Sequence, residues 1–340
     1  MFVFLVIVLL AVLYYVKFRY SRNFLYAFSK TLPTVGELPI LGHTHWFIGG
    51  PERILNNIMV LVKKIEQTGT VCTIWIGPSL YVVSLNPEDV QKILENCLEK
   101  DYSYKFLQAW LGNGLFVAPG RKDILQLLLE RKLAFSNVEL REHIDSITIA
   151  GNDTTALVIS YTLLLLGCHQ DAQDKVYEEL KSIFGDSQRP PTKDDLSKMD
   201  YLDRVIKETM RLYTVVPIIG RKTDKELKLS TFTIPAGVGC AVIPMVMHRS
   251  KKLWGPDADS FDPDRFLPEH CAARHPCAYI PFSYGTRNCI GRHFGMLAMK
   301  SILASVLRSY KVSSKTCDRL KIEILLFPVR GHQITVEKRQ

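Results

Sequence analysis

The residues with the most evident chemistry in this 340-residue chain lie in one run near the C-terminus, Phe282-Ser-Tyr-Gly-Thr-Arg-Asn-Cys-Ile-Gly-Arg292. The run places a single cysteine, Cys289, in a glycine-rich loop flanked by cations, and a helical pattern of apolar residues follows it. Such a loop can present one thiolate to a soft metal centre, while backbone N–H groups and Arg287 stabilise its charge. The sequence therefore favours a metal–thiolate site.

A second polar group interrupts a long apolar helix, which a capping box at Ser136 and Glu139 predicts to begin there and to run to about Cys168. The residues from 150 to 155 read Ala-Gly-Asn-Asp-Thr-Thr. Glycine inside a helix costs about 1 kcal/mol relative to alanine, and is tolerated where something must approach the backbone closely. The alternative is a local kink, with the threonines bonding back to carbonyls and the aspartate capping a bend.

A third candidate is the pair Glu208 and Arg211, which lie three residues apart on one face of a helix expected from Tyr201 to Tyr213. Taken alone, this pair would be a solvated ion pair on the surface. A further arginine, Arg265, follows in the segment Phe-Asp-Pro-Asp-Arg-Phe.

Taken together and in this order, these runs resemble the motifs of the cytochrome P450 superfamily. Residues 282–291 are similar to its haem-binding signature F-x-x-G-x-R-x-C-x-G, and residues 150–155 look like its oxygen-activation motif. Glu208, Arg211 and Arg265 match its E-x-x-R and P-x-R-F pair, which implies a buried, structural ion network behind the haem. His248 is expected to be a structural histidine rather than a metal ligand.

The resemblance implies haem b with Cys289 as the axial thiolate ligand, and oxygen activation by Asp153 and Thr154 through proton relay. It also implies that Arg221, in the segment that begins at Val216, reaches a haem propionate. The residues assigned to haem binding are Cys289, Phe282, Gly285, Arg287, Gly291, Arg221, Ala150 and Gly151. The implied reaction inserts one oxygen atom from O2 into a lipophilic substrate such as a fatty acid, hormone or xenobiotic.

The resemblance predicts a mainly α fold with small β-sheets. Hydrophobic periodicity and turn residues predict helices at 52–65, from Pro87 onward, 137–168, 170–184, 201–213 and 294–307. Strands are expected at 71–76, 80–85 and within 227–243, with a closing hairpin around Gly331. The predicted organisation is an anchor (1–20), an N-terminal strand and helix part (21–120), and a part with the oxygen-activation helix and haem site (121–340).

The N-terminus is predicted to be a membrane anchor, because residues 1–16 carry no charge and Lys17, Arg19 and Arg22 follow. Basic residues on this side place the catalytic part in the cytosol, at the endoplasmic reticulum membrane. A cleaved signal peptide, the alternative, normally has basic residues before the apolar run. The apolar stretch 156–166 could suggest a second span, but the polar residues before it favour a buried core helix.

Composition narrows the possible partners. The formal net charge of +9 suits anionic lipid or an acidic protein, and no basic stripe with interleaved aromatics points to nucleic acid. Eight dispersed cysteines without CxxC pairs indicate reduced thiols rather than a zinc module or disulfide scaffold. The chain has no dinucleotide-binding fingerprint, so the resemblance implies that electrons from NADPH arrive through a separate flavoprotein reductase.

The chain departs from the family pattern at Gly120, which Arg121 follows at once. In the family, a helix with a propionate-binding W-x-x-x-R pair and a long run of further helices would stand between them. We therefore expect an internally shortened variant, from an alternative transcript or an incomplete gene model. Ala150 stands where some ω-hydroxylases carry a glutamate that bonds to haem, so covalent attachment is not expected. The rival interpretations are a haem-binding but catalytically impaired relative, and a cofactor-free structural membrane protein.

Overall fold

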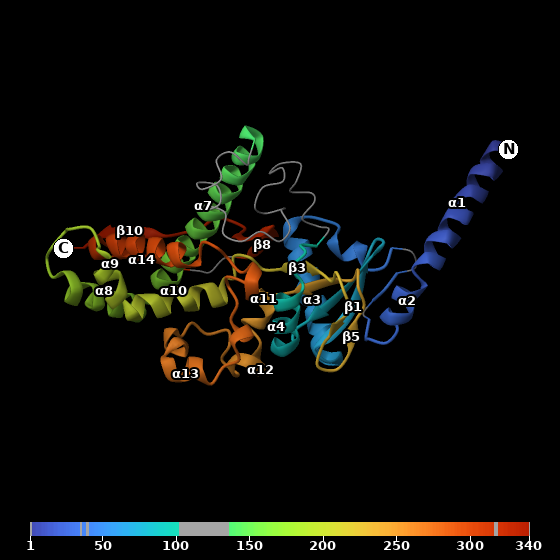
Figure 1. Cartoon of the computed structure of the whole chain (residues 1–340). Coiled ribbons are helices and arrows are strands. Elements are labelled where there is room, and N and C mark those ends of the chain that lie inside the picture. Colours follow the sequence, from blue (N-terminus) through green and yellow to red (C-terminus); the bar gives the residue numbers. More distant parts are fainter. Residues whose placement is uncertain (1, 35, 39–40, 102–135, 316–318, 340) are drawn as a thin grey trace.

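The computed structural model describes residues 2–34, 36–38, 41–101, 136–315 and 319–339 (Figure 1). The junction between Gly120 and Arg121 lies outside these ranges, as do the helical residues expected from 121 to 135. The oxygen-activation helix, the cysteine loop and the ion network all lie within them.

Helices dominate the described residues, as the sequence predicted. The longer ones are α1 (Phe2–Ser21), α3 (Pro51–Thr68), α4 (Pro87–Asn96), α7 (Asn137–Cys168), α8 (Gln170–Phe184), α10 (Asp200–Leu212) and α14 (Arg292–Ser309). The shorter ones are α2 (Asn23–Ser29), α9 (Lys193–Lys198), α11 (Pro244–Met247), α12 (Lys251–Trp254) and α13 (Pro268–Ala272). Single 3₁₀ turns are η1 (Thr44–Phe47), η3 (Pro263–Phe266), η4 (Pro276–Ala278) and η5 (Gly285–Arg287).

The capping residues read from the sequence act as expected. Ser136 and Glu139 form the capping box that begins α7, and the Asn86 side chain accepts from the N–H of Glu88 at the start of α4. Helix α8 ends at Gly185, whose φ of 56° is unfavourable for residues with a side chain. These local signals fix the bounds of the helices that frame the site.

The largest sheet has four strands in the order β1-β2-β6-β3. Strand β2 pairs antiparallel with β1 and parallel with β6, and β3 pairs antiparallel with β6. Its strands are β1 (Val71–Ile76), β2 (Ser79–Ser84), β3 (Ile219–Lys222) and β6 (Gly239–Val242). Three two-stranded sheets are formed by β4 (Leu227–Lys228) with β5 (Thr233–Ile234), β7 (Tyr310–Ser313) with β10 (Thr335–Lys338), and β8 (Leu320–Glu323) with β9 (Leu325–Pro328).

The expected hairpin around Gly331 is wrong. Strand β9 pairs with β8 across a tight turn at Ile324, and β10 pairs instead with β7, which lies more than twenty residues earlier in the chain. Gly331 does occupy a turn with a φ of 76°, so the local turn signal was sound. The pairing partner depends on packing against α7 and α14, which a local pattern does not contain.

Two apolar cores lie side by side, and the chain passes between them repeatedly. One joins the four-stranded sheet to α3 and α4, and the other joins α7, α8, α10 and α14. Figure 1 shows the sheet and α3 on one side and α8, α10 and α14 on the other, with η3 to η5 and α11 to α13 in the connecting stretch. The second core buries Leu164, Leu165 and Leu166, which supports a core helix over a second membrane span for this stretch.

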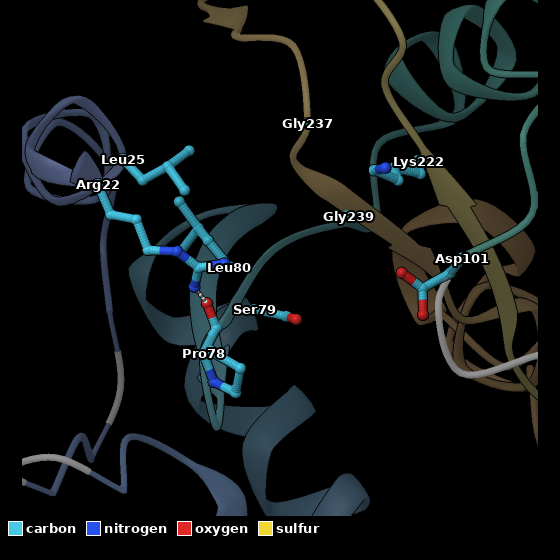
Figure 2. Close-up of a pocket in the computed structure, with 9 residues that line it drawn as sticks. All are labelled: Arg22, Leu25, Pro78, Ser79, Leu80, Asp101, Lys222, Gly237 and Gly239. Atoms are coloured by element: carbon cyan, nitrogen blue, oxygen red, sulfur yellow. Dashed lines mark hydrogen bonds between the residues drawn. The ribbon is translucent and has the colours of Figure 1, made fainter. Parts of the chain in front are cut away.

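Helix α1 extends away from both cores (Figure 1). Residues 4–21 are long and apolar enough to cross a membrane, and none of that window is buried against the protein. Residues 141–168 pass the same test of length and composition, with 39% of the window buried. Beyond α1, Arg22 donates a hydrogen bond to the carbonyl of Pro78 and so ties the base of the helix to the β1–β2 turn (Figure 2).

Candidate functional site

The cysteine loop lies between η5 and the start of α14. The N–H of Cys289 donates to the carbonyl of Phe282 at 2.8 Å and closes the loop. The N–H of Arg292 donates to the Cys289 carbonyl at 3.4 Å, and the backbone N–H groups of Gly291 and Arg292 act on the sulfur electrostatically. Burial of the sulfur raises the pKa of Cys289, and these two donors lower it, although the residue as a whole is exposed. The loop thus presents an accessible sulfur whose negative charge would be met by two N–H dipoles.

The glycine at position 285 is required by a close approach. Its φ is 76°, and a Cβ placed there would lie 2.6 Å from the carbonyl oxygen of Leu94. The loop therefore sits directly on the C-terminal end of α4. Two positions earlier, Ser283 also has a positive φ, 64°, which is uncommon for a residue with a side chain. The backbone of this loop is held in a specific, partly strained shape.

Arg221 connects the four-stranded sheet to this loop. It lies on β3 with 4% of its surface exposed, and its Nη2 donates to the Ser283 hydroxyl at 3.3 Å. Arg287 lies in η5, where burial lowers its pKa. Burial and then the charge of Arg287 lower the pKa of Lys100. Burial and backbone N–H groups, by contrast, are the causes that shift the pKa of the Cys289 thiol.

The loop and α7 share the same apolar core. Phe282 packs against the cluster that contains Leu157 and Val158 of α7, and α14 packs along α7. Within α7, the hydroxyl of Thr154 donates to the Ala150 carbonyl at 2.6 Å, which is the local back-bond anticipated as the alternative interpretation. Asp153 is exposed, and its carboxylate accepts from the Asn152 amide at 3.4 Å.

The structure of α7 is compatible with both interpretations of its polar motif. Among the residues that the structure describes, no atom would lie within 4 Å of a Cβ at Gly151, so none of them packs against this face of the helix. The Thr154 hydroxyl donates its proton to the Ala150 carbonyl within the helix. The hydroxyl would have to rotate away from this carbonyl to pass a proton to a ligand.

The residues around Cys289 fit a haem group. The donor is a single accessible sulfur with two N–H groups directed at it. Next to it the apolar side chains of Ile290 and Phe294 are 53% and 78% exposed, which is surface that a flat apolar porphyrin would cover. Arg221 and Arg287 supply positive charge for its carboxylates. Haem could be held here by the loop, by Arg221 and by the face of α7 that carries Gly151.

Two cavities lined by described residues lie elsewhere. One, of about 60 Å³, is lined by Arg22, Ser79, Asp101, Lys222 and Gly239, at the base of α2 (Figure 2). The other, of about 310 Å³, lies between α1 and the Trp75 region. Neither is lined by a residue assigned to haem binding or oxygen activation.

The ion network lies behind the loop and is buried, as the resemblance implied. Glu208 and Arg211 are both 0% exposed and form two hydrogen bonds of 2.6 and 2.7 Å. Arg211 also donates to the carbonyls of His248 and Ser260, while Glu208 accepts from the N–H of Asp262 at 2.9 Å. Arg265 approaches Glu208 at 3.8 Å. The pair therefore joins α10 to the segment that precedes the cysteine loop.

His248 is a structural histidine, as expected. The N–H of Ile280 donates to its Nε2 at 2.9 Å, so Nδ1 carries the proton and bonds to the Thr214 hydroxyl at 2.8 Å. Burial, then the charge of Arg211, lowers the pKa of His248 to about 3. The neutral ring thus connects the end of α10 to the segment that leads into the loop.

Sequence reasoning missed several residues of this region. Lys100, which lies near Arg221 and Arg287, was not singled out, and neither was Ser283. Thr214 was noted only as a departure from the family's usual proline, yet it is the partner of His248. Ser283 could have been found from the sequence, because it lies inside the run that matches the signature. No sequence pattern identifies Lys100, because its position depends on how the end of α4 meets β3.

The comparisons with known proteins agree with this geometry. The family model of cytochrome P450 matches residues 101–336. Cytochrome P450 4g15 of Drosophila melanogaster is 41% identical over 227 residues, which is 64% of this chain and 39% of the relative. Cytochrome P450 4c3 of the same organism is 40% identical over 228 residues, 64% of this chain and 42% of the relative. Cytochrome P450 4V2 of Mus musculus is 39% identical over 240 residues, which is 68% of this chain and 46% of the relative.

This chain belongs to the cytochrome P450 family, whose members hold haem b through an axial cysteine thiolate. It spans about two fifths of the length of the curated relatives it matches.

Removal of the buried carboxylate should destabilise the protein strongly. We expect Glu208→Gln to lower the free energy of unfolding by about 3–5 kcal/mol, because the buried Arg211 guanidinium loses its compensating charge. Urea unfolding of the detergent-solubilised chain measures this. The matched control is Asp145→Asn, which breaks an exposed i,i+4 pair (Arg141 84%, Asp145 50% exposed) and should change stability by less than about 0.5 kcal/mol. Equal effects of the two changes would contradict the assignment of the network.

His248 should make stability fall in acid. Its pKa in the folded state, about 3, lies below the ordinary value of about 6.5, so between these pH values only the unfolded chain gains the proton. Stability should therefore decrease as the pH falls from about 6.5 toward 3, by up to about 1.4 kcal/mol per pH unit. In His248→Gln the slope of unfolding free energy against pH should be smaller by that amount. An unchanged slope in His248→Gln would rule out this role.

Proposed function

We propose that this chain is a haem-thiolate monooxygenase that inserts one oxygen atom from O2 into a lipophilic substrate. Electrons would come from NADPH through a separate flavoprotein reductase. The observation that carries the proposal is the cysteine loop, in which Cys289 is exposed, two backbone N–H groups lower the pKa of its thiol, and exposed apolar side chains and the buried Arg221 lie nearby. The family membership supports the same chemistry.

The loop residues have distinct roles in this proposal. Cys289 binds the iron, and the N–H groups of Gly291 and Arg292 stabilise its negative charge. Gly285 lets the loop rest on α4, and Phe282 fixes it to the core of α7. Arg221 and Arg287 bind the haem carboxylates. When bound, haem on an axial thiolate supplies the activation of dioxygen and the oxidising power.

Helix α7 would supply protons and space. The small residues Ala150 and Gly151 would leave space for the cofactor beside the helix, and a rotated Thr154 hydroxyl would hold a proton on that side. Asp153 is exposed and can exchange protons with solvent before passing them inward. This assignment is supported by the match of residues 150–155 to the family motif.

Helix α1 supports a membrane location for the protein, and the positive charge after the cysteine loop supports an acidic redox partner. A 20-residue apolar helix without buried surface suits a membrane anchor, and its trailing basic residues favour the cytosolic face of the endoplasmic reticulum. Arg292 and His293 are exposed at the start of α14. Positive charge at this place suits an acidic redox partner. The proposed organisation is a membrane anchor (1–20), an N-terminal strand and helix part (21–120), and a part with the oxygen-activation helix and haem site (121–340).

A second candidate function is haem binding with impaired turnover. It is favoured by the direct succession of Gly120 and Arg121, where the family pattern has a propionate-binding helix and the helices that cover the substrate. In such an internally shortened chain, α7 would keep exposed apolar residues such as Val138 (66%) and Ile144 (52%). Water would then reach the haem face more easily.

The ligand assignment predicts a spectrum. When the full chain is loaded with hemin, reduced and treated with carbon monoxide, the Soret band should shift to the long wavelength typical of a thiolate ligand. Cys289→Ala should lose this shifted band completely, because the sulfur is removed from the iron. The control Cys271→Ala removes another exposed thiol and should keep it. A band that survives in Cys289→Ala, or a wild type that takes up no pigment, would refute the proposed function.

The role of Thr154 can be tested by measuring how much product is formed per NADPH consumed. With added reductase and a lauric-acid-like substrate, Thr154→Val should lower the product formed per NADPH by about 10²-fold, the scale of a lost proton-transfer group. Thr154→Ser, which keeps the hydroxyl, should recover most of it. Thr148→Val, on an exposed part of the same helix, should match the wild type. A thiolate spectrum without any wild-type turnover would support the impaired alternative.

A further inference from the structure

A cavity of about 310 Å³ lies where the end of α1 meets the four-stranded sheet, apart from every residue assigned to haem binding. Aromatic rings make up most of its wall, and one cation and one carboxylate accompany them. These lining residues are Tyr14, Tyr15, Phe18, Tyr26 and Trp75, with Arg19 and Glu37. The proposed oxygen chemistry uses none of them, so the cavity requires an explanation of its own.

Contacts between side chains hold the walls of the cavity together. Tyr26 of α2 stacks on Trp75 of β1, with ring centroids 4.5 Å apart. The guanidinium carbon of Arg19 lies 3.7 Å from the centroid of the Tyr26 ring, and that of Arg22 lies 4.5 Å from the Phe18 ring. Arg22 also donates its hydrogen bond to the β1–β2 turn. The end of α1 and the edge of the sheet thus form one joint site.

Glu37 brings a negative charge to this site. Leu38 and Gly42 exchange two backbone hydrogen bonds of 3.0 and 2.9 Å, and a Cβ at Gly42 would lie 2.6 Å from the Cβ of Trp75. This close packing holds the segment that carries Glu37 against the aromatic wall. Among the described residues, none forms an ion pair or hydrogen bond with the exposed Glu37 side chain. Its charge is therefore available to a cationic ligand.

The chemistry of the wall suits a zwitterion. Aromatic faces bind quaternary ammonium groups, because the ring quadrupole attracts a cation. The Glu37 carboxylate adds to that attraction. A primary ammonium suits such a wall less well, because its N–H groups lose their hydrogen bonds to water there. Arg19 can bind a phosphate at the same time by charge-assisted hydrogen bonds. A trimethylammonium joined to a phosphate by a short link matches both ends of the site.

The position of the cavity indicates where such a ligand would come from. Tyr14, Tyr15, Phe18 and Arg19 belong to the last two turns of α1, which ends at Ser21. In the proposed membrane orientation, these turns lie at the depth of the lipid headgroups, where tyrosine rings and basic side chains gather. A phospholipid headgroup would enter the cavity directly from the membrane.

We propose that this cavity binds the headgroup of a choline phospholipid. The trimethylammonium would lie among the aromatic rings near Glu37, and the phosphate would lie at Arg19. The inference rests on the proposed membrane location of α1 and is independent of haem. Two simpler explanations make different predictions. An ordinary belt of interfacial aromatic residues would prefer no headgroup, and the positive charge of Lys17, Arg19 and Arg22 alone would prefer anionic lipid.

The test is a competition among lipids. The full chain is purified in a non-ionic detergent with equal amounts of phosphatidylcholine, phosphatidylethanolamine and phosphatidylglycerol that carry the same acyl chains. Native mass spectrometry then counts the lipid molecules that the protein retains. We expect the wild type to retain phosphatidylcholine about fivefold more than either other lipid, the scale of a cation–π contact.

Matched variants assign this preference to the cavity. Glu37→Gln and Tyr15→Leu should each bring retention of the three lipids close to equality, because each removes a group that attracts the ammonium. Tyr15→Phe keeps the ring and should keep the preference. The controls are Glu66→Gln, an exposed carboxylate of α3, and Tyr20→Leu, an 83% exposed tyrosine of α1 outside the cavity. Both should retain lipids as the wild type does.

The outcomes separate this inference from the membrane location on which it rests. A chain that fails to float with vesicles of the three mixed lipids would refute the membrane location itself. If the chain floats but retains the three lipids equally, or retains mainly phosphatidylglycerol, the inference is overturned. It is also overturned if Glu37→Gln keeps the full preference, or if Tyr20→Leu loses it as completely as Tyr15→Leu does. A preference that is lost in both cavity variants and kept in both controls supports it.

Discussion

The buried pair of Glu208 and Arg211 is the interaction on which the rest of the site depends. A carboxylate and a guanidinium that are both withdrawn from water are tolerated only when nearly every donor and acceptor is satisfied. Here Arg211 donates to the carbonyls of His248 and Ser260, and Glu208 accepts from the N–H of Asp262. These groups belong to an irregular segment that has little apolar core of its own. The pair therefore gives this segment a fixed path toward the cysteine loop.

His248 extends the same constraint by neutral hydrogen bonds. One ring nitrogen bonds to Thr214 at the end of α10, and the other accepts from Ile280, two residues before Phe282. A charged imidazole beside Arg211 would be repelled, so a neutral ring is the form that fits. In this way α10, a helix without any residue assigned to haem binding, helps to determine where the loop begins. The position of the sulfur follows from polar groups that are remote from it.

Much of the fold could be predicted from the sequence because its signals are local. The capping box at Ser136, the cap at Asn86 and the stop at Gly185 give the bounds of α7, α4 and α8 to within a residue. The cysteine loop was also identifiable, since its chemistry lies in eleven consecutive residues. The pairing of β10 with β7 could not be found in this way, because strand partners depend on tertiary packing. Lys100 was missed for the same reason, as its relation to Arg221 passes through a single backbone bond between Glu99 and Lys222.

The distribution of charge around Cys289 indicates how such a site can both bind and tune a cofactor. Backbone N–H groups lower the pKa of the Cys289 thiol, whereas the full charges of Arg287 and Arg221 act on Lys100. A cation paired directly with the thiolate would withdraw electron density from it, and the thiolate's value as an axial ligand lies in donating that density. N–H donors stabilise the anion with less withdrawal and also fix its orientation. In the proposed site, Arg221 and Arg287 would instead bind the carboxylates of the cofactor. Binding strength and electronic tuning are thus assigned to different residues, and a change in one can leave the other intact.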